Sequence, residues 1–347
     1  MKKAEFRIGH RMVGENHPPL VIAEIGINHD GRSDIANYMI DYAGEVGCEC
    51  VKFQCHIPQA EMVENDVIPD NAKESIWKMM NRCALAYEKE VYLKQYTESY
   101  DMIYLSTPFS REAADRLNGM NVPAFKIGSG ECTNYPLIEH ICKFGKPVIL
   151  STGMADLAEI GRAVNIITSF NLPYALMHCT SEYPTPYEHV RLGVITRLRE
   201  LFPDAVIGFS DHSMGINAAL GAVALGASII EKHFTYSKDL PGSDIPISIM
   251  PKELEALIIG CNQIHMSMQG DKHDVPPGEE SVAAFAHACI VSIADIKEGD
   301  VFTENNIWVK RPGTGAFPAN MYNELLGKKA TNDIKKDSQL RLEDVLL

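Results

Sequence analysis

Eight short apolar segments recur along the chain up to residue 234, and each is followed by a segment of helical character. Near-continuous apolar strands of this kind are typical of a parallel sheet that is covered on both faces. Eight strand-then-helix units within about 250 residues favour a (β/α)8 TIM barrel. An open, doubly wound sheet would usually carry a G-x-G-x-x-G loop after its first strand, whereas residues 26–31 read GINHDG. The predicted strands span residues 20–26, 50–55, 102–109, 124–131, 147–154, 174–180, 206–211 and 228–234.

The sequence on either side of this repeat predicts two additions to the barrel. Residues 5–14 alternate in polarity around Gly9, which predicts a short hairpin. Residues 269–281 are polar and rich in proline and glycine, and beyond residue 286 short strands and turns follow at close spacing. We therefore predict an α/β chain with a hairpin and barrel at 1–268, a linker at 269–285 and a small β-rich domain at 286–347.

Composition limits the partners and the compartment. The net charge of −14 argues against nucleic acid and anionic membrane surfaces as partners. Nine cysteines without paired spacing indicate free thiols in a reducing cytosol rather than disulfides or a zinc site. The N-terminal residues lack the apolar core of a signal peptide, and the apolar stretch around 218–230 is too short to span a membrane. We expect a cytoplasmic protein.

Charged side chains interrupt several of the apolar strands. Glu24, Lys52 and Lys126 lie within strands, where a buried charge is costly unless it is paired or used. The carboxyl ends of parallel strands are where ligands bind in this fold class, and these residues all fall toward that end. An internal salt-bridge network is the structural alternative. We favour a functional site.

Two histidines close the last two predicted strands. His212 follows Ser-Asp and His233 follows Glu-Lys, so adjacent parallel strands would bring the two imidazoles side by side. Imidazole is the commonest metal-binding side chain, which predicts a divalent-metal site. On spacing alone, two satisfied structural histidines remain an equal alternative.

The remaining polar side chains at the strand ends suggest the chemistry. Lysines and hydroxyls together form a cage for phosphate and carboxylate groups. Glu24 and Glu131 could move protons, and a metal on the two histidines could activate a carbonyl. An anionic substrate, a carbonyl electrophile and proton transfer indicate carbon–carbon bond formation with an enol phosphate. The residues of the predicted cage are Lys52, Thr107, Lys126, Ser129, Ser151 and Ser210.

These strand ends resemble those of the sialic acid synthase family, the phosphoenolpyruvate-dependent nonulosonate synthases. IWVKRPG (307–313) would fall in the antifreeze-like (SAF) domain that ends chains of this family. The resemblance covers essentially the whole chain, in an ordered series of segments. These are IAEIGINHDG (22–31), VKFQ (51–54), STPFS (106–110), FKIGSGE (125–131), STGMA (151–155), CTSEYPTP (179–186), IGFSDHS (207–213), EKHFT (231–235) and PGSD (241–244).

The resemblance implies a transferase that condenses phosphoenolpyruvate with N-acetylmannosamine and water, giving N-acetylneuraminate and phosphate. A divalent metal, usually Mn²⁺, with Mg²⁺ or Co²⁺ as alternatives, would be held by His212 and His233 and would activate the sugar's aldehyde. Glu24 matches a carboxylate between the two substrates. Residues that match contacts to phosphoenolpyruvate are Lys52, Thr107, Lys126, Ser129, Ser151, Ser181 and Ser210; those that match contacts to the amino sugar are Gln54, Tyr183 and Asp244.

Family members form homodimers in which the small domain reaches over the partner's barrel. Arg311 matches an arginine that enters the partner's site and holds the N-acetyl group, and Phe285 matches an aromatic residue beside it. Neither role follows from local sequence, where Arg311 reads only as a charged turn.

Two departures from the family pattern concern the sugar. Ser181 stands where many bacterial sialic acid synthases have asparagine, and Phe53 stands where close relatives often carry histidine. A legionaminate or related synthase, acting on a 2,4-diacetamido-6-deoxy hexose, is therefore one alternative. A pyruvate-type metal aldolase is a second. A binding module on an inactive barrel is a third, against which the set of Glu24, Lys126, His212 and His233 argues.

Overall fold

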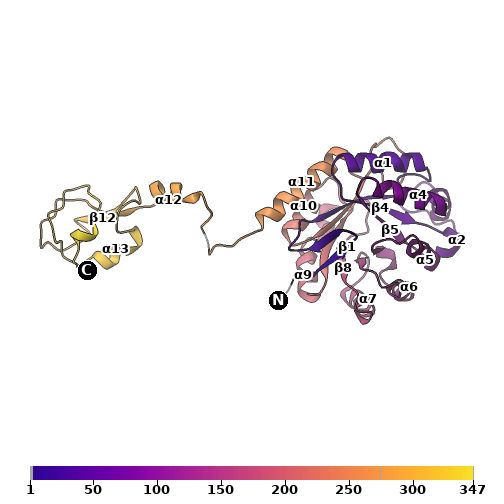
Figure 1. The fold of residues 1–347 in the computed structure, drawn as a ribbon, viewed down its shortest axis with the longest axis horizontal. Coiled ribbons are helices and arrows are strands. Elements are labelled where there is room, and N and C mark those ends of the chain that lie inside the picture. The colour runs from indigo at the N-terminus through magenta and orange to yellow at the C-terminus, as the bar shows by residue number, and fades with distance from the viewer. Residues whose placement is uncertain (1–2, 274, 347) are drawn as a thin grey trace. The chain divides into compact units, whose positions relative to one another are not determined.

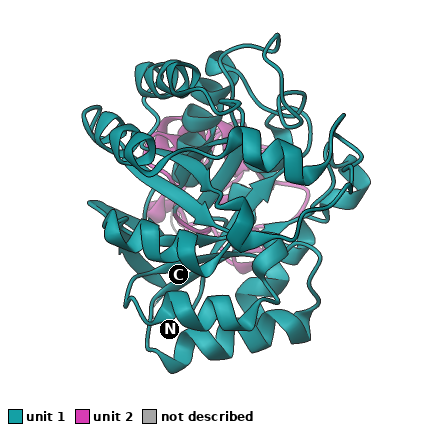
Figure 2. Cartoon of the chain, turned by 90° about the vertical axis from the view of Figure 1, so that its right-hand side faces the viewer, with its two compact units in different colours: residues 1–269 teal, residues 270–347 magenta. Residues whose placement is uncertain are grey.

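The computed structural model describes residues 3–273 and 275–346. The chain separates into two compact units, Met1–Gln269 and Gly270–Leu347 (Figure 2). Each unit has its own hydrophobic core.

The first unit is built on eight parallel strands that curl into a nearly closed barrel (Figure 1). Their order is β5-β4-β3-β10-β9-β8-β7-β6, and the two end strands, β5 and β6, contact each other. This confirms the predicted (β/α)8 barrel. The strands are β3 (Leu20–Gly26), β4 (Cys50–Cys55), β5 (Ile103–Pro108), β6 (Phe125–Ile127), β7 (Val148–Ser151), β8 (Tyr174–Cys179), β9 (Val206–Asp211) and β10 (Ile229–His233).

Helices surround the strands of the first unit (Figures 1 and 2). Two short helices, α8 and α9, follow β8 in place of one continuous helix, because Arg191 adopts a left-handed conformation with φ of 52° between them. The helices of this unit are α1 (Ser33–Glu45), α2 (Pro58–Glu61), α3 (Ile76–Cys83), α4 (Tyr87–Glu98), α5 (Arg111–Gly119), η1 (Ser129–Glu131), α6 (Tyr135–Cys142), α7 (Leu157–Ser169), α8 (Tyr187–Val190), α9 (Gly193–Leu201), α10 (Asn217–Ala224) and α11 (Pro251–Ser267).

The two-residue period of the strands decides which side chains enter the barrel. Successive residues of a strand point to opposite faces. In β3, Val21 and Ala23 pack in the cluster that joins strands to helices, whereas Leu20 and Ile22 belong to a second cluster inside the barrel. Glu24 follows Ile22 in the inward-facing set, so a carboxylate lies directly above an apolar layer.

A hairpin closes the end of the barrel at which the strands begin. Strands β1 (Glu5–Ile8) and β2 (Arg11–Gly14) pair antiparallel, as predicted. Three of their side chains, Phe6, Ile8 and Val13, are buried in the same cluster as the inward-facing apolar residues of the barrel. The barrel is therefore packed with apolar side chains at this end.

The second unit is a small domain with a two-stranded antiparallel sheet, β11 (Cys289–Ser292) and β12 (Ile307–Lys310). Its core contains Ile290, Phe302 and Phe317. Helix α12 (Glu279–Ala286) occupies the last part of the segment predicted as a linker. The other short elements are η2 (Ala319–Met321), α13 (Tyr322–Leu325) and η3 (Leu342–Asp344).

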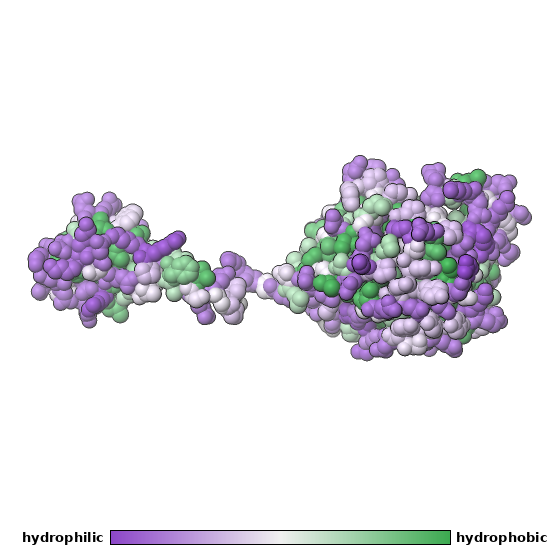
Figure 3. All heavy atoms as spheres, turned by 90° about the horizontal axis from the view of Figure 1, so that it is seen from above, coloured by the Kyte–Doolittle hydropathy of each residue, from purple (hydrophilic) through white to green (hydrophobic). Residues whose placement is uncertain are grey.

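The visible surface of both units is mostly hydrophilic, with smaller apolar areas between the polar ones (Figure 3). Within residues 3–273 and 275–346, no helix has the length and apolar character needed to cross a membrane.

Candidate active site

A cavity of about 840 Å³ lies in the first unit, at the end of the barrel where the strands finish. All predicted site residues of the barrel line it, although they come from different strands and loops. These are Glu24, Lys52, Gln54, Thr107, Lys126, Ser129, Glu131, Ser151, Ser181, Tyr183, Ser210, His212, His233 and Asp244. The two remaining predicted residues, Phe285 and Arg311, belong to the second unit, where their side chains are exposed.

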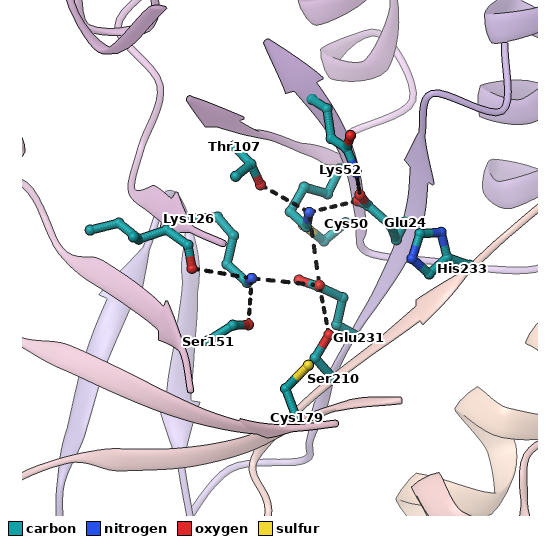
Figure 4. A network of polar contacts seen from close by, with 12 residues as sticks. Glu24, Cys50, Lys52, Thr107, Lys126, Ser151, Cys179, Ser210, Glu231 and His233 are labelled. Atoms are coloured by element: carbon teal, nitrogen blue, oxygen red, sulfur yellow. Dashed lines mark hydrogen bonds and ion pairs between the residues drawn. The ribbon is translucent and has the colours of Figure 1, made fainter. Parts of the chain in front are cut away.

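Two buried lysines and two buried carboxylates form the floor of this cavity (Figure 4). Lys52 Nζ lies 2.7 Å from Glu24 Oε2 and 3.8 Å from Glu231 Oε1. Lys126 Nζ lies 3.6 Å from the same Glu231 oxygen. The strand register explains the grouping, because Lys52 pairs with Glu24 across β3 and β4, while Lys126 reaches Glu231 across the barrel.

Burial and charge act against each other in this group. Burial raises the pKa of Glu24 to about 7, against the opposing effect of the Lys52 ammonium. Burial would also raise the pKa of Glu231, but the ammonium groups of Lys126 and Lys52 hold it below its ordinary value. Burial lowers the pKa of Lys126, and Glu231 only partly offsets this. Near neutral pH, Glu231 is therefore the ionised counter-charge and Glu24 can exchange a proton.

Hydroxyl groups extend the floor into a donor-rich surface. Lys126 Nζ donates to Ser151 Oγ at 2.7 Å, and Lys52 Nζ donates to Thr107 Oγ1 at 3.0 Å. Ser210 Oγ donates to Glu231 Oε1 at 3.0 Å. An anion that replaced the Glu231 carboxylate would meet two ammonium groups and these hydroxyls at once.

The backbone at Gly153 approaches the same surface closely. Its N–H donates to Ser129 Oγ at 3.1 Å. A Cβ atom at this position would lie 2.5 Å from Ser181 Oγ and 2.8 Å from Ser129 Oγ. A side chain at this position would therefore push the two serine hydroxyls away from the chain after β7.

His212 and His233 lie side by side at the cavity wall, with ring centroids 5.4 Å apart. His212 Nδ1 hydrogen-bonds the Thr180 carbonyl at 2.8 Å, the contact that commonly fixes the tautomer of a metal-binding histidine. His233 Nδ1 is buried without a hydrogen-bond partner among the described residues, and Asp244 Oδ2 lies 3.7 Å from it. Burial, followed by the positive charge of His212, lowers the pKa of His233 well below its ordinary value, so its ring is neutral.

These features fit a metal held by the two imidazoles. Neutral imidazole is the metal-binding form, which burial favours in His233. Burial also acts to lower the pKa of His212, but the neighbouring Cys179 raises it above its ordinary value, so a metal would have to displace a proton from that ring. Among the described residues, each ring retains a nitrogen that is not committed to a protein hydrogen bond. Within residues 3–273 and 275–346, no group of three or more histidine, cysteine or acidic side chains could hold a metal ion. A cation bound by His212 and His233 would therefore leave its other positions to water or substrate.

A buried ion pair anchors the strand ends that carry the two histidines. Lys232 Nζ lies 2.8 Å from Asp211 Oδ2, and the two side chains are 0% and 1% exposed. Asp211 Oδ1 also accepts the Ser213 N–H at 2.8 Å. The pair bridges β9 and β10 on the face that points away from the cavity, because its residues alternate with His212 and His233 along their strands.

Two of the predicted sugar contacts, Tyr183 and Asp244, lie beside the two histidines. The Tyr183 ring stacks on His212, with centroids 4.1 Å apart. Asp244 accepts from Ser243 Oγ at 3.1 Å and from Asn71 Nδ2 at 3.5 Å. Glu131 accepts from Asn134 Nδ2, and burial raises the pKa of its carboxyl group.

Apolar side chains cover one wall of the cavity. They come from the loop after β3 and from the segment around α2 and α3, and part of them form a small cluster of their own. The same cavity is lined by polar groups on its floor and its other walls, as expected of a site for a partly apolar small molecule. The wall is formed by Ile27, Met62, Ile76, Met79 and Met80.

Several cavity residues were not among the predicted ones. Glu231 is the most important, and the alternation along β10 could have identified it, because Ile229, Glu231 and His233 form the inward-facing set. Cys179 of β8 is a second, with its Sγ 3.8 Å from His212 Nδ1. His56 and Glu61 lie in the long segment after β4, where no periodic pattern indicates which side chains turn inward.

Comparison with known proteins agrees with this geometry. The NeuB family model matches residues 39–273, and the SAF domain model matches residues 287–346. The N,N'-diacetyllegionaminic acid synthase of Campylobacter jejuni is 37% identical over 331 residues, which cover 93% of this chain and 98% of the relative. The N-acetylneuraminate-9-phosphate synthase of Homo sapiens is 32% identical over 338 residues, covering 96% and 94% of the two chains.

A solved structure shows the same relationship in three dimensions. The N-acetylneuraminic acid synthetase of Leptospira borgpetersenii superimposes with a TM-score of 0.74 at 32% identity, covering 81% of this chain and 95% of that chain. The predicted resemblance is thus confirmed by sequence and by fold. The chain belongs to the NeuB family and carries a SAF domain after its barrel.

Proposed function

We propose that the protein condenses phosphoenolpyruvate with N-acetylmannosamine and water, releasing phosphate and forming N-acetylneuraminate. The observation that carries this proposal is the floor of the cavity, where Lys52 and Lys126 share the Glu231 carboxylate beside a Glu24 carboxyl of raised pKa. A substrate with both a phosphate and a carboxylate suits two ammonium groups ringed by hydroxyls. All nine cysteines are free thiols, which supports a cytoplasmic location.

We assign the phosphate to Lys126 and the hydroxyl groups near it, and the substrate carboxylate to Lys52. The hydroxyls lie on neighbouring strand ends, so they can hold the phosphate from several sides. The phosphate contacts would come from Lys126, Thr107, Ser129, Ser151, Ser181 and Ser210. This arrangement fixes the double bond of phosphoenolpyruvate relative to the acceptor bound above it.

The reaction needs two proton transfers within the site. Carbon 3 of phosphoenolpyruvate attacks the aldehyde carbon, whose oxygen must gain a proton. Water adds to carbon 2 and loses one proton; the C–O bond to the leaving phosphate then breaks as the new hydroxyl becomes the carbonyl, and the second proton passes to the phosphate oxygen. Glu24, with a pKa of about 7, is suited to give a proton to the aldehyde oxygen and to recover one from the water.

His212 and His233 would hold a divalent cation, for which we propose Mn²⁺. When bound, such a cation supplies Lewis-acid polarisation of the aldehyde. Binding can be measured without turnover, by titrating Mn²⁺ into the protein and following the electron paramagnetic resonance of the free ion. His233→Ala should abolish this binding in a folded protein, and unchanged binding would refute the assignment.

The acceptor would occupy the side of the cavity that carries Gln54, Tyr183 and Asp244. The apolar wall formed by Ile27 and the methionines also favours a second candidate, a 2,4-diacetamido-6-deoxy hexose, whose methyl and second acetyl groups are less polar. Side-by-side turnover of the two sugars separates these candidates. A strong preference for the diacetamido sugar would displace N-acetylmannosamine from the proposal.

Labelled phosphoenolpyruvate tests the reaction class. With ¹⁸O at the bridging position, cleavage of the C–O bond places the label in the released phosphate, which mass spectrometry detects. Phosphate without label would indicate ordinary phosphoester hydrolysis. Turnover of pyruvate without phosphate release would indicate the aldolase alternative.

We further propose that the protein works as a homodimer and that Phe285 and Arg311 complete the sugar site of the partner. Both side chains are exposed on the second unit, which leaves them available for such a contact. Mixing an Arg311→Ala protein with a Glu24→Gln protein tests this directly. Partial recovery of activity in the mixed dimers is expected, because one of their two sites would contain neither change.

A further inference from the structure

A short hydrogen-bonded chain connects Glu24 to the loop that follows β4. Gln54 Nε2 donates to Glu24 Oε1 at 3.1 Å. Gln54 Oε1 lies 3.0 Å from His56 Nε2, and His56 Nδ1 lies 3.0 Å from both oxygens of Glu61. All four side chains line the cavity, so the chain runs along its wall from the floor toward the α2 segment.

The His56 ring is held on one face as well as at its edges. It stacks on Phe109 with centroids 4.6 Å apart and an interplanar angle of 9°. The side chains of His56 and Glu61 are only 5% and 3% exposed. A stacked, buried ring with partners on both nitrogens has one orientation available, which makes it suited to orient a neighbour.

The direction of the chain follows from the donors and acceptors. The amide group of Gln54 turns its NH2 toward Glu24, to which it donates, and its oxygen toward His56. His56 Nε2 must then donate to Gln54, while Nδ1 donates to the Glu61 carboxylate. The network is satisfied when both ring nitrogens of His56 carry hydrogen.

We propose that His56, held by Glu61, is a positioning residue that fixes the Gln54 amide against Glu24 and thereby aligns the acceptor sugar. This inference rests on the proposed function for the identity of the acceptor. His56 and Glu61 touch neither the lysines nor the hydroxyls of the floor in any contact that the structure shows. Their loss should therefore affect the acceptor and leave phosphoenolpyruvate binding nearly unchanged.

The first test reads the His56 ring directly and needs no turnover. Protein labelled with ¹⁵N in its histidine rings is studied by nuclear magnetic resonance at pH 7, and the His56 signals are identified by their loss in His56→Gln. We expect hydrogen on both nitrogens in the wild type, and its loss from one of them in Glu61→Gln. A wild-type ring with a bare Nε2 would mean that the Gln54 amide is reversed, which overturns the proposal.

The second test separates the two substrates by steady-state kinetics. His56→Phe keeps the ring stacked on Phe109 but removes both hydrogen bonds, so the KM for N-acetylmannosamine should rise about tenfold, with the KM for phosphoenolpyruvate changed less than about twofold. His56→Gln can still donate an N–H toward Gln54 and should recover most of the loss. Equal losses in the two variants, or equal changes in both KM values, would overturn the positioning role.

A matched control lies outside the cavity. His140 of α6 also pairs with a carboxylate, Asp115, at 2.7 Å and contacts the edge of Phe144. His140→Phe should change neither KM. If the wild type converts neither sugar, the proposed function fails. The nuclear magnetic resonance measurement would still show whether the His56 ring makes the proposed hydrogen bonds. If His56→Phe does not fold, Glu61→Gln replaces it in the kinetic test.

Discussion

Removing one charge from the buried Asp211–Lys232 pair should strongly destabilise the barrel. Asp211→Asn keeps an oxygen for the Ser213 N–H but leaves the Lys232 ammonium with only the Ser213 carbonyl as a partner. Because both side chains are almost fully buried, water cannot replace the lost carboxylate. Breaking a buried pair in this way costs about 3–5 kcal/mol, a large part of a total stability that is typically about 5–15 kcal/mol.

A double variant distinguishes the loss of the pair from the loss of either side chain. Lys232→Met leaves the Asp211 carboxylate buried with the Ser213 N–H alone, and should cost a similar amount. Asp211→Asn combined with Lys232→Met leaves no charge, so it should be less destabilised than the sum of the single variants by about 2 kcal/mol or more.

The chain offers a simple probe for this measurement. It has two tryptophans, Trp77 in α3 of the first unit and Trp308 in β12 of the second. In a Trp308→Phe background, fluorescence during urea unfolding reports the first unit alone. Additive losses in the double variant, or a loss below about 1 kcal/mol in Asp211→Asn, would refute the reasoning from burial.

Three further changes test other features of the first unit. Burial lowers the pKa of His29 from 6.5 to about 4, so between these values the unfolded chain binds a proton that the folded chain excludes. The free energy of unfolding should therefore rise with pH through this range, by on the order of 3 kcal/mol in total. Above the range, this contribution of His29 is fully present. Urea unfolding at several pH values measures this rise, which should be smaller in His29→Gln. If the free energy of unfolding rises with pH equally in the variant and the wild type, the assignment to His29 is wrong. Glu231→Gln removes the carboxylate that competes for the two lysines, so calorimetry should show inorganic phosphate binding roughly tenfold more tightly. Weaker binding would show that Glu231 is not the competing anion. Gly153→Ala places a methyl group against Ser181 Oγ, so the KM for phosphoenolpyruvate should rise about tenfold while the acceptor KM is kept. Steady-state kinetics with each substrate varied in turn measures the two KM values. A rise in the KM of the acceptor as well would indicate a general distortion of the site.

The barrel could be predicted from sequence because each strand carries its own signal. The eight apolar runs give the number of strands, and parallel pairing brings their carboxyl ends together, so Glu24, Lys52 and Lys126 could be placed at one site. Glu231 was missed because it stands between Ile230 and Lys232 in a run that shows no alternation in polarity. Counting back two residues from His233 would have placed Glu231 in the barrel and Lys232 outside it, as the register of β10 does.

Other features could not follow from local patterns. The segment after β4 has no regular period, so nothing in it indicated that His56 and Glu61 would turn into the cavity. The roles proposed for Phe285 and Arg311 depend entirely on family resemblance, because a contact between two copies leaves no periodic signal in one sequence.

The hairpin that closes the barrel has a consequence for the order of events in catalysis. Phe6, Ile8 and Val13 help to fill one end of the barrel with apolar side chains, so molecules reach the cavity from its other end and not through the hairpin. The lysines lie at the bottom of that dead-end chamber, and the proposed sugar contacts lie nearer its mouth. A molecule seated at the bottom has to arrive before the one that covers it, and cannot leave until the upper one has gone. With the proposed function, phosphoenolpyruvate would therefore load first and phosphate would leave last.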